Sequence, residues 1–149
     1  MASLVENRKA RFNYEILDTY EAGIELFGFE VKALRNGMGT LEGSHVTMRG
    51  NEAYLIGANI APYQPLNTPK EYDSMRNRRL LLKKKEIAEL TATEAKKGLT
   101  IVPLSVYNRG SRIKVQIATV RGKKKFDKRE TIKKRESDRE IRRTLKESI

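Results

Sequence analysis

The side chains with the clearest binding chemistry are the cations near the C-terminal end of the chain. The run RGKKKFDKRETIKKRE, residues 121–136, contains nine Lys and Arg residues and a single aromatic residue, Phe126. Such cations bind phosphate groups and release condensed counterions, and an exposed aromatic ring stacks on a base. A polyanionic partner is therefore expected. The alternative interpretation is a solvated tail that only keeps the protein soluble.

The positive charge is unevenly distributed along the chain. The 149 residues carry 31 Lys and Arg against 19 Asp and Glu, a net charge of +12, and residues 121–149 hold 13 of the basic and 6 of the acidic residues. A membrane-binding helix would need a broad apolar face, which this segment lacks. Nucleic acid is therefore favoured over a membrane, and RNA over DNA, because small β-barrels with basic and aromatic rims commonly bind RNA.

Residue types that support catalysis or metal binding are scarce. The chain has no cysteine and one histidine, His45, which lies in a strand-like pattern. One imidazole without thiolates does not form a familiar metal site, and neither a P-loop nor a G-x-G-x-x-G motif occurs. We expect no catalytic residue, metal or cofactor; a metal-dependent nuclease is the enzymatic alternative.

Targeting signals are not visible in the sequence. No apolar run approaches the roughly 20 residues that span a bilayer, and the first residues, MASLVENRKARF, contain no apolar signal-peptide core. A cytoplasmic protein without a membrane partner is expected.

The periodicity of apolar side chains in the first half of the chain predicts several strands and one short helix. Residues 11–20 predict a strand, paired with GIELFG after a turn near residues 21–23. EVKALRNG predicts a short helix that ends at Gly37. HVTM and EAYLIG, residues 45–57, predict a hairpin, and the three prolines of residues 62–75 predict an exposed loop.

The second half predicts one long helix and one clear hairpin. A helix is expected after Asp73 or Ser74 through RRLLLKKKEIAEL, followed by a short helical piece, TEAKKG, that ends at Gly98. LTIVPLSVY and RIKVQIATV predict a hairpin with its turn at residues 108–111 and its last strand ending at Val120. The expected buried side chains are Leu80, Leu81, Ile87 and Leu90 of the helix and Ile113, Val115 and Ile117 of the last strand.

These elements predict a mainly β fold with an embedded helix. Six or seven short strands suit a small OB-fold-like β-barrel over residues 1–120, although the pattern does not give the strand order. Residues 121–149 form a basic tail whose apolar stripe of Ile141, Leu145 and Ile149 is too narrow to hold a helix on a core. We expect this tail to be disordered when free and helical on a partner.

Several motifs, taken together and in order, resemble one family over nearly the whole chain. The segments ENRKARFNYEILDTYEAGIELFGFEVKALRNG, RNRRLLLKKKEI, KGLTIVPLSVY and IKVQIATVRGKKKFDKRETIKKRE closely resemble the SsrA-binding protein (SmpB) family. The resemblance implies an OB-fold barrel with a flexible basic tail and no enzymatic activity. It implies binding to the tRNA-like domain of transfer-messenger RNA, which elongation factor Tu with GTP helps deliver to stalled ribosomes. The tail would enter the empty mRNA channel near the decoding region of the small subunit.

The resemblance also implies site residues. RNA contacts fall on Asn7, Lys9 and Arg11 of NRKAR, Glu21 and Gly23 of the EAG turn, Arg79 and Leu81 of the RRLLL helix, and Lys114. Glu21 would accept hydrogen bonds from base amino groups or 2′-hydroxyls; the alternative is a turn residue that caps its own backbone. The ribosome-contacting tail residues are Lys123, Lys124, Phe126, Asp127, Lys128, Arg129, Lys133, Lys134 and Arg135.

Two positions depart from the family pattern. Phe12 stands where members often have His, and Phe126 where they often have His or Tyr. Stacking on RNA tolerates both changes, whereas a role that needs an imidazole does not. The alternative function is a general binder of structured RNA or a ribosome-associated protein whose tail is only an electrostatic anchor.

Overall fold

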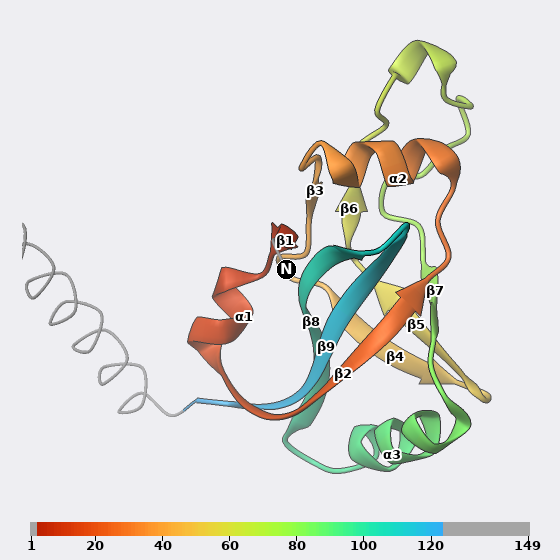
Figure 1. Ribbon diagram of the computed structural model, residues 1–149. Helices are drawn as coiled ribbons and strands as arrows, with labels where there is room; N and C mark the ends of the chain where they lie inside the picture. The colour runs from red at the N-terminus through yellow and green to blue at the C-terminus, as the bar shows by residue number, and fades with distance from the viewer. Residues whose placement is uncertain (1–2, 124–149) are drawn as a thin grey trace, which may run out of the picture.

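The computed structural model describes residues 3–123 and arranges them as a curled β-sheet with helices at its two ends and on one side (Figure 1). In chain order the elements are β1 (Ser3–Glu6), α1 (Arg8–Asn13), β2 (Tyr14–Ile24), α2 (Gly28–Arg35), β3 (Gly39–Thr40), β4 (His45–Arg49), β5 (Glu52–Ile56), β6 (Asn59–Ile60), a 3₁₀ turn (Pro65–Asn67), β7 (Arg78–Leu81), α3 (Lys84–Glu94), β8 (Leu99–Arg109) and β9 (Arg112–Gly122).

The sheet has seven strands in the order β1-β8-β9-β2-β7-β5-β4, and β3 pairs separately with β6. Every pairing between neighbouring strands is antiparallel. Because β4 also approaches β8, the sheet curls into a partly open barrel, with α3 at one end and α2 at the other (Figure 1). The predicted OB-fold-like class, mainly β with an embedded helix, is confirmed.

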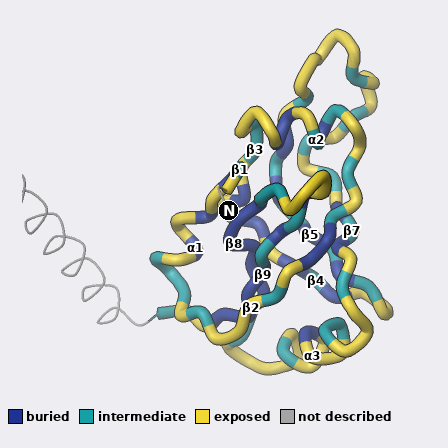
Figure 2. The backbone as a smooth tube through the Cα atoms, viewed as in Figure 1, coloured by how far each residue is buried: buried dark blue, intermediate teal, exposed yellow. Residues whose placement is uncertain are grey.

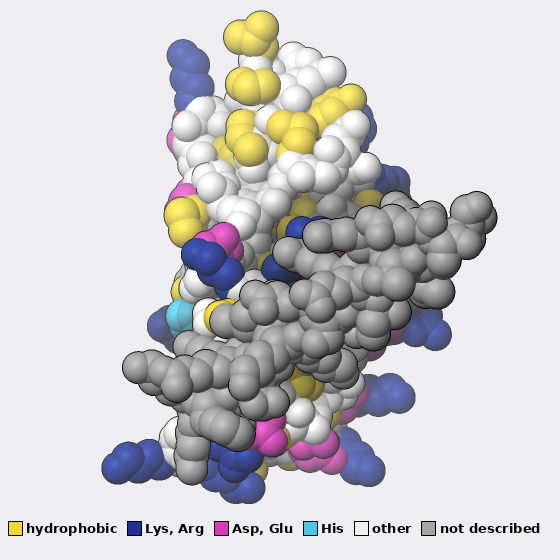
Figure 3. Space-filling view, turned by 90° about the vertical axis from the view of Figure 1, so that its left-hand side faces the viewer, with side chains coloured by type: hydrophobic (Ala, Val, Ile, Leu, Met, Phe, Trp, Pro, Cys, Tyr) yellow, Lys and Arg dark blue, Asp and Glu magenta, His cyan; other side chains and the backbone are white. Residues whose placement is uncertain are grey.

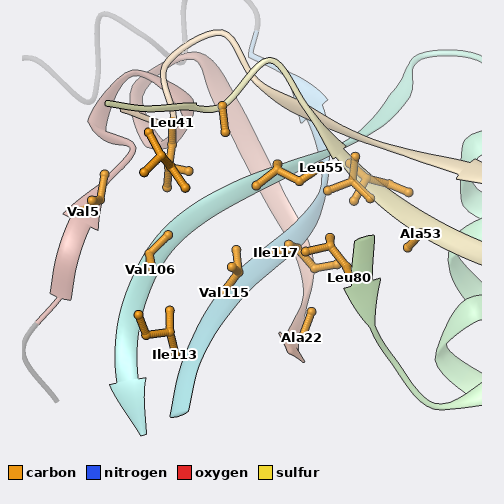
Figure 4. Close-up of a cluster of buried hydrophobic side chains, with 14 of the residues drawn as sticks. Val5, Ala22, Leu41, Ala53, Leu55, Leu80, Val106, Ile113, Val115 and Ile117 are labelled. Atoms are coloured by element: carbon orange, nitrogen blue, oxygen red, sulfur yellow. The ribbon is translucent and has the colours of Figure 1, made fainter. Parts of the chain in front are cut away.

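Alternating side chains from most of the strands fill the interior of the barrel. Figure 4 shows Ala22 of β2, Leu80 of β7, Val106 of β8 and Val115 of β9 in one apolar cluster. All four are at most 2% exposed. Burying such side chains removes apolar surface from water at roughly 25 cal/mol per Å², so this cluster is the main stabilising element of the barrel.

A second, smaller apolar cluster lies outside the barrel, beneath α1. Ala10 packs there against Val102 and Leu104 of β8 and against Ala118 and Val120 of β9. The alternation along β8 and β9 therefore buries both faces of these strands, and they are dark blue over most of their length in Figure 2.

The prediction of a strand from residue 11 is wrong, because residues 8–13 form α1. Asn7 caps this helix: its Oδ1 accepts a hydrogen bond from the Ala10 amide at 3.2 Å. Phe12 is therefore a helical residue. Tyr14 and Ile16 do belong to a strand and share a face, which is why the spacing of the three side chains misled the prediction.

The predicted hairpin turn at residues 21–23 is also wrong, because β2 runs through these residues without interruption. Ala22 and Gly23 are buried, and Gly23 pairs with Lys114 of β9 on one side and with Leu81 of β7 on the other. Its φ is not positive, so this glycine is required for close packing between strands and not for a turn.

The predicted long helix after residue 73 is divided into a strand and a shorter helix. Arg78 and Leu80 of β7 are buried and alternate with outward Arg79 and Leu81, a period of two. The helix α3 begins at Lys84 and ends at Glu94, so TEAKKG is no separate helix. Gly98 ends the following turn with φ +84°.

The remaining elements agree with the sequence patterns. The helix before Gly37, the hairpin of β4 and β5, the long loop before β7 and the hairpin of β8 and β9 are confirmed. Residues 3–123 contain nine strands, more than the six or seven expected, and β9 ends at Gly122 instead of Val120.

The loop between β6 and β7 projects from the upper end of the barrel (Figure 1). Together with Phe27 it exposes the large apolar side chains of Tyr63, Leu66 and Met75, and Leu66 is 100% exposed. The hydrophobic side chains in Figure 3 gather at this upper end, whereas Lys, Arg, Asp and Glu are mixed at the lower end.

Candidate nucleic-acid interface

Five side chains and one glycine line the outer surface of four neighbouring strands, β8, β9, β2 and β7. Across β2 and β9, Glu21 is opposite Gln116, and Gly23 is opposite Lys114; Gly23 is also opposite Leu81 of β7, and Lys114 is opposite Tyr107 of β8. Their chain neighbours Ala22, Leu80, Val106 and Val115 point into the core (Figure 4). Because side chains alternate along a strand, the six residues share the outer side, which we call the open face: Glu21, Gly23, Leu81, Tyr107, Lys114 and Gln116.

Glu21 is held on the open face by two donors from β8. The Tyr107 hydroxyl donates to Glu21 Oε2 at 2.6 Å, and Arg109 Nη1 donates to the same oxygen at 2.7 Å. These bonds lower the pKa of Glu21, while burial and the bond to Glu21 raise the pKa of Tyr107 to about 12. The group is therefore an ionised acceptor held in place by two donors, and it does not cap its own turn.

Gly23 creates a shallow hollow between β7 and β9. A Cβ at this position would lie 3.2 Å from Leu81 Cβ, closer than ordinary packing allows. Leu81 is 47% exposed beside it, and Lys114 and Arg112 line the other side of the hollow. An apolar wall, bare backbone and two cations suit the close approach of a sugar or base with its phosphate.

Arg11 joins the open face although it belongs to α1. Its Nη2 donates to Gln116 Oε1 at 3.5 Å, and its Nε lies 3.8 Å from Glu6 Oε2. Arg11, Glu21, Tyr107 and Gln116 line one polar hollow. The structure thus brings together five predicted residues from distant parts of the chain: Arg11, Glu21, Gly23, Leu81 and Lys114.

Asn7 has a structural environment. It is 4% exposed, and its Nδ2 donates to the Pro103 carbonyl at 2.8 Å, next to an irregularity in the pairing of β8 with β9. With its bond to the Ala10 amide, this contact fixes α1 on the barrel. The side chain therefore positions Lys9 and Arg11 and is itself buried.

Lys9 lies apart from the open face. It forms an ion pair with Glu42 and lines a different hollow with Tyr14 and His45. The exposed side chain retains access to solvent, so an anion can compete with Glu42 for it.

Arg79 follows the open face along β7 but is engaged by two carboxylates. Its Nη1 donates to Glu25 Oε1 at 3.2 Å, and its Nη2 lies 2.9 Å from Glu52 Oε1. The positive charge of Arg79 is therefore already neutralised by two carboxylates before any partner binds.

A buried ionic cluster, which the sequence patterns did not reveal, supports the start of β7. Glu30 and Arg78 are both 0% exposed, and Arg78 Nη2 donates to Glu30 Oε2 at 2.7 Å. Burial alone would raise the pKa of Glu30, but hydrogen bonds from Arg76, the Phe27 amide, Tyr72 and Arg78 outweigh burial and lower that pKa. The cluster ties α2 and the projecting loop to β7, which carries Leu81.

Tyr107, Arg109 and Gln116 are the functional candidates that motif reasoning missed. Gln116 was visible as part of the polar side of the last strand, but the hydrogen bonds to Glu21 cross 86 and 88 residues of sequence. No local signal in the chain predicts such pairs.

The predicted tail lies mostly outside the described residues. Lys123 is described, and its amide donates to the Asn13 carbonyl at 3.0 Å, so the chain leaves the barrel beside α1. Lys124, Phe126, Asp127, Lys128, Arg129, Lys133, Lys134 and Arg135 are outside residues 3–123.

Within residues 3–123 no group of three or more His, Cys, Asp or Glu side chains is placed to hold a metal ion. In the same segment no helix has the length and apolar character to cross a membrane.

Comparison with known proteins identifies the family. The family model described as SmpB protein matches residues 4–147. The chain belongs to the SmpB family. Two SmpB-family relatives named SsrA-binding protein are 48% identical in Gloeobacter violaceus, over 96% of this chain and 93% of the relative, and 47% identical in Gloeothece citriformis, over 96% and 92%.

A solved structure supports both the fold and the family. The chain described under "tmRNA-SmpB: a journey to the center of the bacterial ribosome" matches with a TM-score of 0.68 and 46% identity. The match covers 80% of this chain and 84% of the other. The fold of the barrel is thus shared with the matched chain of known structure.

Proposed function

We propose that this chain binds the tRNA-like domain of transfer-messenger RNA and supports the association of that RNA with stalled ribosomes in trans-translation. The observation that carries the proposal is the open face, where Glu21, Gly23 and Lys114 combine an acceptor, a close approach and a cation. The SmpB-family relatives are named for binding SsrA, and the related structure pairs SmpB with tmRNA and the ribosome. The protein acts without catalysis, in the cytoplasm, and meets elongation factor Tu with GTP through the RNA.

The contacts are divided by chemistry. Lys114 and Arg11 bind phosphates, because a cation docked on a phosphate releases counterions. Gly23 and Leu81 receive a sugar or base, and Glu21 accepts a hydrogen bond from the RNA. These interactions depend on the fixed relative positions of the residues on the open face, so they favour one folded RNA over others.

The remaining predicted contacts have supporting roles. Asn7 acts indirectly, by fixing α1 and hence Arg11. Lys9 and Arg79 contact RNA only when a phosphate replaces their carboxylate partners. This replacement costs little energy, because exposed ion pairs contribute little to stability.

A competition assay tests the barrel's role. Labelled tRNA-like RNA is bound to the protein at moderate salt and challenged with an equal mass of an unrelated structured RNA. Preference for the tRNA-like RNA supports the proposal. Equal competition overturns it in favour of a general RNA-binding protein with an electrostatic tail.

For residues 121–149 we propose a separate role at the ribosome. Lys123, Lys124, Lys128 and Arg129 seek phosphates, Phe126 stacks on a base, and Asp127, Lys133, Lys134 and Arg135 extend the contact into the mRNA channel near the decoding region. A channel lined by phosphate on all sides suits a segment with 13 cations. The expected change of this tail from disordered to helical concerns residues outside the described range, 3–123, and stays a prediction.

Truncation after Gly122 tests this division between barrel (residues 1–120) and tail. The truncated protein should still prefer the tRNA-like RNA, with modestly weaker binding and a smaller salt dependence, because phosphate-binding cations are lost. It should not support peptide tagging on stalled ribosomes. Full tagging by the truncated protein would overturn the tail's role, and loss of all RNA preference would overturn the barrel's.

A further inference from the structure

The loop between β6 and β7, residues 61–77, carries large apolar side chains that face solvent. Leu66 at its tip is 100% exposed, and Tyr63, Met75 and Phe27 beside the loop are exposed as well. Hydrophobic side chains gather at this end of the molecule in Figure 3. Single apolar side chains are common on protein surfaces, whereas a group of them marks a site of interaction. We call Phe27, Tyr63, Leu66 and Met75 the loop patch.

The tip of the loop is a closed turn. Residues Pro65–Asn67 form a single 3₁₀ turn. The Thr68 hydroxyl donates to the Gln64 carbonyl at 2.8 Å, and Asn67 Nδ2 donates to Gln64 Oε1 at 2.7 Å. These bonds present Leu66 in a defined position, so docking it on a partner requires little further ordering of the chain.

The base of the loop is fixed by the buried ionic cluster. The Ile60 amide donates to the Ser74 carbonyl at 3.0 Å, so the two ends of the loop meet. Arg78 Nη2 donates to the same carbonyl at 2.9 Å, and the Tyr72 hydroxyl donates to Glu30 Oε2 at 2.8 Å. A fully buried ion pair carries a desolvation cost. Part of its effect here is to hold a loop that projects away from the barrel.

The charge of the loop selects the class of partner. Residues 61–77 contain two basic and two acidic residues, so they have no net charge, whereas the whole chain carries +12. One of the two cations, Arg76, is paired with Glu30 and lies 4.2 Å from the centroid of the Phe27 ring. RNA is bound mainly through cations that neutralise phosphates, and a second copy with the same net charge is repelled. The loop patch therefore fits an uncharged, apolar pocket of another protein.

We propose that the loop patch docks into an apolar pocket of a ribosomal protein when the RNA-bound chain meets the ribosome. The inference rests on the proposed function, which brings the chain to a surface made of RNA and protein, and the uncharged patch fits the protein part. The patch is small, so its affinity alone is weak. Once the bound RNA holds the chain on the ribosome, docking becomes intramolecular and a weak contact is sufficient.

Site-specific photocrosslinking identifies the occupant. Benzoylphenylalanine replaces Leu66 in the full-length chain, which is combined with transfer-messenger RNA, elongation factor Tu, GTP and purified stalled ribosomes. The control carries the same group in place of Asn51, which is exposed in the turn between β4 and β5. We expect irradiation to join position 66, but not position 51, to one ribosomal protein, identified by mass spectrometry. Crosslinks to RNA alone, to a second copy alone or to nothing would overturn the proposal.

Leu66→Ser measures the contribution of the docked side chain. It should weaken association of the RNA–protein complex with stalled ribosomes by roughly tenfold, the effect of burying one leucine side chain. Affinity for the free tRNA-like RNA and the urea midpoint should not change, because Leu66 is fully exposed and lies outside the open face. Leu17→Ser is the matched control, since Leu17 is an exposed leucine of β2 outside the loop. Equal losses of ribosome association in both variants would contradict a specific role of the loop.

The outcomes separate this inference from the function on which it rests. If the wild type and Leu66→Ser bring the RNA to stalled ribosomes with the same affinity, the docking proposal is wrong and the function stands. If Leu66→Ser also loses affinity for the free RNA, the loop acts on the barrel and the docking proposal is again wrong. If the wild type itself shows no RNA-dependent association with ribosomes, the proposed function fails.

Discussion

Two glutamates of this protein are held by the same types of partner in opposite environments. Glu21, on the surface, accepts from Tyr107 and Arg109 through Oε2 alone. Glu30, fully buried, accepts through both oxygens: Oε1 from the Phe27 amide and Arg76, and Oε2 from Tyr72, Arg76 and Arg78. The first carboxylate keeps an acceptor for a ligand; the second has none to spare.

The comparison teaches that burial and saturation, more than residue type, separate a carboxylate that can still accept a ligand from a structural one. A buried charge must be fully paired, because its desolvation costs several kcal/mol. An exposed carboxylate is solvated by water and its ion pairs contribute little to stability. The protein therefore need not pair every lone pair, and the remaining ones are available for recognition. The two sites are also connected, since Arg78 starts the strand that carries Leu81 of the open face.

The largest effect is expected from Glu30→Ala. Removing this carboxylate leaves Arg78 buried without its counter-charge, which should lower the free energy of unfolding by about 3–5 kcal/mol. Urea denaturation followed by circular dichroism measures it. Glu21→Ala is the control and should change stability by less than about 0.5 kcal/mol; similar losses in both variants would remove the distinction between the two sites.

The reverse ranking is expected for RNA binding. Glu21→Ala should reduce affinity for the tRNA-like RNA by roughly ten- to hundredfold and leave binding to an unrelated RNA unchanged or slightly stronger, because a negative charge is removed. Gel-shift titration with both RNAs measures the two affinities. A parallel loss for both RNAs would show that Glu21 does not discriminate.

The pH dependence of stability should report Glu30. Its pKa is lowered in the folded protein from the ordinary value of 4.5, so its stabilising contribution is complete above that value and is lost as pH falls through the folded pKa. Urea midpoints measured from pH 6 to pH 3 should therefore decline below about pH 4.5. Glu30→Gln, which does not titrate, should show a flatter decline; an unchanged slope would contradict the pairing.

The smallest effect is expected from Gly23→Ala. The added Cβ would press on Leu81 Cβ at 3.2 Å, and because Leu81 is half-exposed and able to shift, the cost in stability should be only about 1 kcal/mol. RNA affinity should fall several-fold because the hollow is filled. Gly28→Ala is the matched control, since a Cβ at Gly28 would meet nothing within 4 Å, and it should leave RNA affinity unchanged.

The sequence by itself determined the class of fold, the family and several local elements. Alternating Ile113, Val115 and Ile117 predicted β9. Gly37 and Gly98, both with positive φ, marked the turns that follow α2 and α3. It also pointed to Glu21, Gly23, Leu81 and Lys114 through the family motifs. Such signals are local, because a periodic pattern or a glycine acts on its own neighbours in the chain.

Only the tertiary structure decided which of these residues meet and what they do. Residues 78–81 have the composition of a helix, yet they form a strand because their backbone pairs with β2 and β5, and Arg78 reaches Glu30, 48 residues away. Asn7 is a cap buried against Pro103, 96 residues away, and Glu21 is oriented by Tyr107 and Arg109 from β8. Strand order and register bring these pairs together, and a period of two specifies which face a residue occupies but not which strand lies beside it.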